Sequence, residues 1–214
     1  MNIPDLSTFD PATLTVYAAL AMLSVVALTV AFYKLFQFAS LGVGQTDDAE
    51  AIIDDWLGGR PTDAMRAAAE RDSVLARVLQ AVFSGLQSSP DDRGVATELG
   101  RQTALMELGA MQRRMRVLET VVQAAPMLGL LGTVIGMINA FSTLSSAEGA
   151  LDPALLAGGI WTALTTTALG LAIALVTYVI ANWLEGRIDG ERQAIETLVS
   201  SAIHGRVDPA AGSA

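Results

Sequence analysis

Three long apolar runs divide the chain, and each one is long enough to cross a lipid bilayer. About 20 apolar residues span a hydrocarbon core of roughly 30 Å, whereas a buried helix of a soluble domain needs only about 10–14. The first run follows Asp10-Pro11 and the third follows Asp152-Pro153, and each pair is typical of a helix start. The pattern predicts an all-α membrane protein with three transmembrane helices, at residues 14–38, 117–144 and 154–184.

The polar segment between the first two runs, residues 39–116, has a helical pattern. Its apolar side chains recur at the i, i+3, i+4, i+7 spacing of one helix face: they include Leu75, Val78, Leu79, Val82, Phe83 and Leu86. No stop signal follows between Asp92 and Phe141. We therefore expect one uninterrupted helix that carries the second transmembrane helix far out of the bilayer. Residues 185–214 should begin as a helical extension of the third and end in a flexible tail.

The basic residues determine the expected orientation. Lysine and arginine are absent from residues 1–33 and 117–186, whereas Lys34, Arg113 and Arg187 flank the runs closely. Cytoplasmic flanks are enriched in these residues. We therefore place 39–116 and 185–214 in the cytoplasm, and 1–13 and the loop 145–153 on the opposite side of the membrane. The N-terminus lacks the positive region of a cleaved signal peptide, so we expect the first run to be retained.

Composition narrows the chemistry further. The chain is 52% hydrophobic and 16% charged, and its mean hydropathy of +0.46 exceeds that of a usual soluble domain. It has no cysteine and one histidine, His204, which excludes disulfides, thiolate chemistry and a multi-histidine metal cluster. The formal net charge of −9 argues against nucleic acid. We expect no metal and no cofactor, and the nucleophile–base pair or phosphate loop of an enzyme is missing.

The second and third runs should form a hairpin with small and hydroxylated faces. Small residues let membrane helices approach closely, so the expected helix-packing positions are Gly129, Gly132, Gly136, Ala163 and Gly170, together with Pro126. Pro126 lacks an N–H and should kink the second helix. The candidate ion-pathway residues are Thr133, Thr162, Thr166 and Thr167. A membrane threonine can also serve packing by bonding its own i−4 carbonyl, so both interpretations stay open.

Two sequence stretches carry a likeness to a known family. Ala125 to Phe141 reads APMLGLLGTVIGMINAF, and Gly158 to Leu175 reads GGIWTALTTTALGLAIAL. The elements A-P, G-L-x-G-T-V-x-G and T-T-A-x-G-L occur in order, and with this spacing the chain resembles the MotA/TolQ/ExbB proton-channel family. Its three-run layout, with a large segment after the first run, is similar to the ExbB/TolQ branch, because the flagellar branch has four spans.

The resemblance implies a location, an assembly and a function. The location is a bacterial inner membrane, with the N-terminus in the periplasm and the C-terminus in the cytoplasm. Such proteins form homopentamers around single-span partner helices of the ExbD/TolR kind, and protons that pass through the complex drive mechanical work on the cell envelope. Thr133 and Thr167 match the two threonines that line the pore beside the partner's membrane aspartate. Thr162 stands where ExbB and TolQ usually have a glutamate. The resemblance then implies that the partner's aspartate carries the proton.

Two functions from different classes remain at this point. The first is a subunit of an ion-driven motor complex that contacts membrane lipids, and the expected ion is the proton. The second is a structural membrane scaffold of the same fold that has lost conduction together with the glutamate. Glu119, at the start of the second run, could contact the exit path or a partner, although a solvated interfacial charge is the commoner role. Asp152 and Glu148 lie in the short loop, where helix capping suits Asp152.

Overall fold

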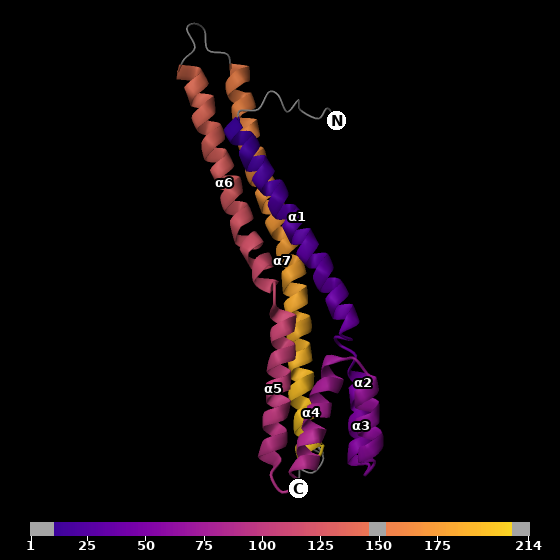
Figure 1. Cartoon of the computed structure of the whole chain (residues 1–214). Helices are drawn as coiled ribbons and strands as arrows, with labels where there is room; N and C mark the ends of the chain where they lie inside the picture. The colour runs from indigo at the N-terminus through magenta and orange to yellow at the C-terminus, as the bar shows by residue number, and fades with distance from the viewer. Residues whose placement is uncertain (1–10, 146–152, 207–214) are drawn as a thin grey trace, which may run out of the picture. The chain divides into compact units, whose positions relative to one another are not determined.

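The computed structural model describes residues 11–145 and 153–206, and all regular elements in these ranges are α-helices (Figure 1). They are α1 (Pro11–Ser40), α2 (Thr46–Leu57), α3 (Pro61–Glu70), α4 (Val74–Ser88), α5 (Arg93–Gln112), α6 (Met115–Ser145) and α7 (Pro153–His204). Three stretches are long and apolar enough to cross a membrane, within Pro11–Ser40, Arg93–Ser145 and Leu156–His204. The prediction of an all-helical chain with three membrane-spanning helices is confirmed for this part. The expectations for Glu148, Asp152, the first ten residues and the tail lie outside the described residues.

The chain divides into two compact units. The first, here called the apolar unit, holds residues 11–33, 114–145 and 153–182 of the described part. The second, here called the polar unit, holds residues 34–113 and 183–206. The apolar unit therefore contains most of α1, all of α6 and the first part of α7. The polar unit contains α2 to α5 with the ends of α1 and α7.

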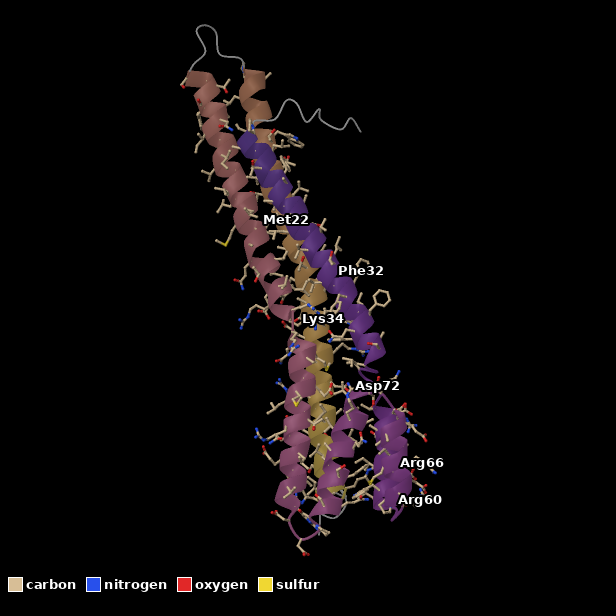
Figure 2. All side chains as sticks on the ribbon, in the orientation of Figure 1. Met22, Phe32, Lys34, Arg60, Arg66 and Asp72 are labelled. Atoms are coloured by element: carbon tan, nitrogen blue, oxygen red, sulfur yellow. The ribbon has the colours of Figure 1, made fainter. Side chains whose placement is uncertain are left out.

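The apolar unit packs three helices around small side chains and leaves large ones outside. Val16 and Leu20 of α1 meet Ala125 of α6 and Ala174 of α7 in one buried cluster, and the three helices run side by side within this unit (Figure 1). Large apolar side chains are exposed instead, and Met22 and Phe32 stand out from α1 (Figure 2). Such an inverted pattern is costly in water but normal in lipid, because lipid tails are as apolar as leucine.

The polar unit has an ordinary hydrophobic core. The apolar face of α4 is buried along its length, and the ring of its Phe83 stacks on Trp56 of α2 at a centroid distance of 4.1 Å. Ser73 caps α4 because its hydroxyl oxygen accepts the Ala76 N–H at 3.2 Å. These contacts explain why the segment that separates two membrane helices folds as a bundle rather than as a linker.

One sequence prediction about this region is wrong. The helix expected to run unbroken from Asp92 to Phe141 is interrupted, because α5 ends at Gln112 and α6 begins at Met115. Arg113 adopts φ −54° and ψ 139°, and Arg114 has a φ of 67°, in the left-handed region that glycine favours. The Arg114 guanidinium lies 4.3 Å from the Tyr33 ring centroid, a cation–π contact that offsets part of the backbone cost.

The interruption is stabilised by side chains that are distant in the sequence. The last carbonyls of a helix have no partner within it, and here α1 supplies donors to those of α5. The Lys34 ammonium (labelled in Figure 2) is fully buried and donates to the Met111 carbonyl at 2.5 Å and to Gln37 Oε1 at 2.9 Å. Gln37 Nε2 donates to the Ala110 carbonyl at 3.4 Å. A lysine that the sequence marked only as the end of a span therefore caps a helix.

Candidate functional site

The hairpin of α6 and α7 is held together by backbone contact at its glycines. A Cβ placed on Gly170 would lie 2.5 Å from the Ala125 carbonyl oxygen, and one on Gly129 would lie 2.9 Å from Thr167 Cα. A Cβ on Gly136 would lie 2.8 Å from Ala163 Cβ. The structure thus places the expected packing positions where α6 and α7 touch, including Gly132, which faces the side chain of Thr166. α6 continues through Pro126 without interruption.

One carbonyl in this contact receives two threonine hydroxyls. Thr166 is fully buried, and its Oγ1 lies 2.6 Å from the Ala163 carbonyl oxygen and 3.2 Å from that of Gly129. Thr167 Oγ1 donates to the same Gly129 oxygen at 3.0 Å. These two candidate ion-pathway residues therefore join α7 to α6 within one chain. Hydroxyl bonds of this kind contribute about 0.6 kcal/mol on average between membrane helices.

The other candidate threonines bond only to their own helix. Thr133 Oγ1 donates to the Leu130 carbonyl at 2.6 Å, and Thr162 Oγ1 donates to that of Gly158 at 3.0 Å. Thr165, on the same helix as Thr162, donates to the Trp161 carbonyl at 2.8 Å. Since a hydroxyl has one hydrogen and two lone pairs, each of these groups spends its donor on the backbone. Only acceptor lone pairs are left for whatever approaches the helix surface.

The structure does not bring all four candidates together. Thr166 and Thr167 meet at Gly129, whereas Thr133 lines a shallow groove on the outer face of α6. That groove is otherwise mostly apolar, with lining residues Val134, Met137, Ile138, Phe141, Ser142 and Ser145. No hydrogen bond of the described residues joins Thr133 to Thr167. Their shared role in an ion pathway stays a prediction, and it requires a second helix or a second copy along the groove.

Acids and bases are absent from the body of the hairpin. Residues 120–145 and 153–184 contain no aspartate, glutamate, lysine, arginine or histidine. Glu119 is exposed at the start of α6 and His204 is exposed at the end of α7, and the described residues hold no cluster of three metal-ligating side chains. A proton that crosses beside this hairpin must therefore be carried by water or by a group from another chain.

Two buried charged residues escaped the sequence analysis, and both lie in the polar unit. They are Lys34, which caps α5, and Glu191 of α7, which is only 2% exposed. Each closes or follows an apolar run, so each reads as a solvated flanking charge in the sequence. The helical spacing of Leu184, Ile188, Glu191 and Ile195 was the one available signal, because it places Glu191 on the buried face of α7.

Comparison with known proteins agrees with this architecture. The model of the MotA/TolQ/ExbB proton channel family matches residues 70–197, more than half of the chain. The chain belongs to the MotA/TolQ/ExbB proton channel family. The matched range runs from the end of α3 through α6 and most of α7, so it includes the hairpin, the interruption at Arg114 and Glu191. The resemblance stated from the two hairpin motifs is confirmed.

Individual relatives point to the ExbB/TolQ branch. A protein of Methanothermobacter thermautotrophicus named as an ExbB homolog of biopolymer transport is 32% identical over 148 residues, 69% of this chain and 51% of the relative. An ExbB-like biopolymer transport protein of Synechocystis is 33% identical over 162 residues, 73% and 61% of the two chains. The Tol-Pal system protein TolQ of Haemophilus influenzae is 37% identical over 116 residues, 52% and 50%.

The chain spans between half and about three-fifths of the length of these relatives. With three apolar helices and this family, the chain is a multi-pass membrane protein, and the family to which it belongs is one of membrane channels.

Proposed function

We propose that this chain is a subunit of a proton-driven motor complex of a bacterial inner membrane. It assembles as a homopentamer around single-span partner helices of the ExbD/TolR kind and couples the proton motive force to mechanical work on the envelope. The observation that carries the proposal is the body of the hairpin, which contains no acidic residue and whose described threonines donate their hydrogens to backbone carbonyls. Family membership and relatives named for biopolymer transport and the Tol-Pal system support it.

The chemistry of the hairpin fits a carrier supplied by another chain. A wall of hydroxyl lone pairs accepts hydrogen bonds from water, from hydronium or from a protonated carboxyl, but it holds no charge of its own. One charge that crosses 100 mV releases about 2.3 kcal/mol, enough to switch a helix between two packed arrangements. The partner's membrane aspartate would carry the proton past Thr133, and the groove on α6 is where a second helix would lie.

Proton flux in liposomes tests this proposal. The complex purified from native membranes through a tag on this chain should conduct protons, whereas this chain alone should not, because residues 120–145 and 153–184 of its hairpin contain no carboxylate. Thr133→Val combined with Thr167→Val removes two hydroxyls at nearly constant volume. We expect the double variant to assemble and to lose most of the flux, by about a factor of ten or more if each hydroxyl stabilises the passing carboxyl by a typical hydrogen-bond energy.

Thr165→Val is the matched control for this experiment. Thr165 lies on α7 and donates to its own helix, as Thr162 does, but it is not among the candidate pathway residues. Full flux in the double variant, or equal losses in the double variant and the control, would favour the alternative function. That alternative, a scaffold that only packs, draws support from the two threonine hydroxyls at Gly129.

Membrane orientation is a separate prediction that cysteine labelling checks. The chain has no cysteine, so single cysteines can be introduced without background. With the N-terminus in the periplasm, a cysteine at Ser146, outside the described residues, should react with a membrane-impermeant reagent in intact cells. A cysteine at Ser88, the last residue of α4, should react only after permeabilisation. The reverse pattern would overturn the proposed topology.

A further inference from the structure

A single peptide group after α1 is held by α7 at both of its polar atoms. Arg187 Nη2 donates to the Val43 carbonyl at 3.2 Å, and the Gly44 N–H donates to Glu191 Oε2 at 2.9 Å. Val43 O and Gly44 N belong to the same peptide bond, and Arg187 and Glu191 lie one helical turn apart. Gly44 has a φ of 87°, and a Cβ there would lie 3.2 Å from Arg187 Nη1. The turn at residues 41–45 is thus built to lie against these two side chains.

The carboxyl that completes this clamp is buried and only half satisfied. Glu191 is 2% exposed, and its Oε1 is buried without a hydrogen-bond partner among the described residues. A buried ionised carboxylate needs partners on both oxygens, and this one has a partner on Oε2 alone. Burial raises the pKa of the Glu191 carboxyl above its ordinary value, against the opposing effects of the Gly44 N–H and the Arg187 charge.

Few charges face this carboxyl. Arg187, one turn earlier on α7, is the one that acts on it electrostatically, and the turn at residues 41–45 has no ionisable side chain. The start of α4 packs on the same turn through the Val74 N–H, which donates to the Leu41 carbonyl. Of the charges close to that point in the sequence, Asp72 and Arg77 pair with each other, Arg77 also pairs with Glu107, and Arg71 pairs with Asp48. Lys34 of α1 is engaged with Met111 and Gln37.

We propose that Glu191 is a proton-operated latch that holds the turn after α1 against α7 when protonated and releases it when ionised. Arg187 provides the interaction that favours the released state, in which Glu191 is ionised. It lies four residues before Glu191, the spacing of a helical ion pair, yet it donates to Val43 instead and forms no salt bridge with Glu191. Once ionised, the carboxylate attracts the guanidinium of Arg187 away from Val43. The Val43 carbonyl then loses the hydrogen bond that it accepts from Arg187.

The direction of the pH effect follows from the raised pKa. The folded clamp binds the proton more tightly than an exposed glutamate does, so its stability is fully present at acidic pH. That contribution starts to fall once the pH passes the ordinary carboxyl value of 4.5, and it is gone above the raised pKa. The attachment of the turn at residues 41–45 to α7 thereby responds to the pH of the compartment that holds the polar unit. This latch does not depend on ion conduction through the hairpin.

Amide hydrogen exchange of the full chain in nanodiscs tests the latch. Rates are measured from mildly acidic to mildly alkaline pH and divided by the intrinsic rate at each pH. In the wild type, protection of residues 41–45 should fall by about tenfold as the pH rises. Glu191→Gln should keep high protection at every pH, because the glutamine amide oxygen still accepts the Gly44 N–H and cannot ionise.

Glu196→Gln is the matched control, since Glu196 is an exposed glutamate on the same helix. It should retain the pH dependence of the wild type. Protection in the wild type that does not change with pH, or a pH dependence that persists unchanged in Glu191→Gln, would overturn the latch. A carbon-13 titration of the glutamate carboxyls gives a second readout on the wild type alone, and a Glu191 midpoint at or below ordinary values would also overturn it.

Discussion

Gly170→Ala is expected to destabilise the hairpin of α6 and α7 by about 1–3 kcal/mol, the usual cost of adding a methyl group to a packed interior. The added Cβ would lie 2.5 Å from the Ala125 carbonyl oxygen and 3.1 Å from Gly129 Cα. Both atoms belong to the backbone of α6, so no side-chain rotation can make room. The helices must move apart, which weakens the bond from Thr167 to the Gly129 carbonyl as well. The midpoint of thermal unfolding in mild detergent should fall accordingly.

Gly158→Ala provides the control on the same helix. A Cβ at Gly158 would meet no atom within 4 Å, and alanine has the better helix propensity by roughly 1 kcal/mol. This variant should unfold at the wild-type temperature or slightly above it. Equal unfolding temperatures for the two variants would mean that the contact at Gly170 does not hold the hairpin together.

The three-span architecture was predictable because its signals are local. Each of the three runs contains an uncharged stretch long enough to cross a membrane, and this can be read directly from the sequence. The glycines of the hairpin were predictable for a similar reason, since their spacing alone places them on one face. The role of Thr166 was not, because a hydroxyl that packs and one that lines a pathway have the same sequence pattern.

The interruption between α5 and α6 depends on a residue far away in the sequence. Arg113 and Arg114 have no intrinsic tendency to end a helix, and neither is followed by glycine or proline. What ends α5 is a set of donors from α1, 77 residues away for Lys34 and Met111. Glu191 escaped prediction for the same reason, since its partner Gly44 is 147 residues away. Sequence patterns report local preference, whereas these two charges are placed by tertiary contacts.

Lys34→Met should therefore loosen the end of α5 without unfolding the chain. Methionine keeps an unbranched apolar stem of similar length but removes the ammonium, so the Met111 carbonyl and Gln37 Oε1 both lose a donor. An unpaired buried polar group costs about 1–3 kcal/mol. The same change also removes the cost of burying a charge, and such replacements are often neutral for global stability. The lost hydrogen bonds should appear in the local opening of α5, whereas the relief of the buried charge should appear in the global stability. An experiment that measures both quantities separates the two effects.

Amide hydrogen exchange of the full chain measures the local opening, and the thermal midpoint reports the global stability. Amides in the last turn of α5 and at Arg113–Arg114 should exchange about ten to a hundred times faster in Lys34→Met, which corresponds to the loss of the cap. The thermal midpoint should change little, because relief of the buried charge offsets the lost hydrogen bonds. Arg101→Met is the control on α5, since the Arg101 side chain is 61% exposed in its pair with Glu98, and exposed pairs contribute little. Unchanged exchange at the end of α5 in Lys34→Met would show that the interruption is intrinsic to Arg113 and Arg114 and needs no donor from α1.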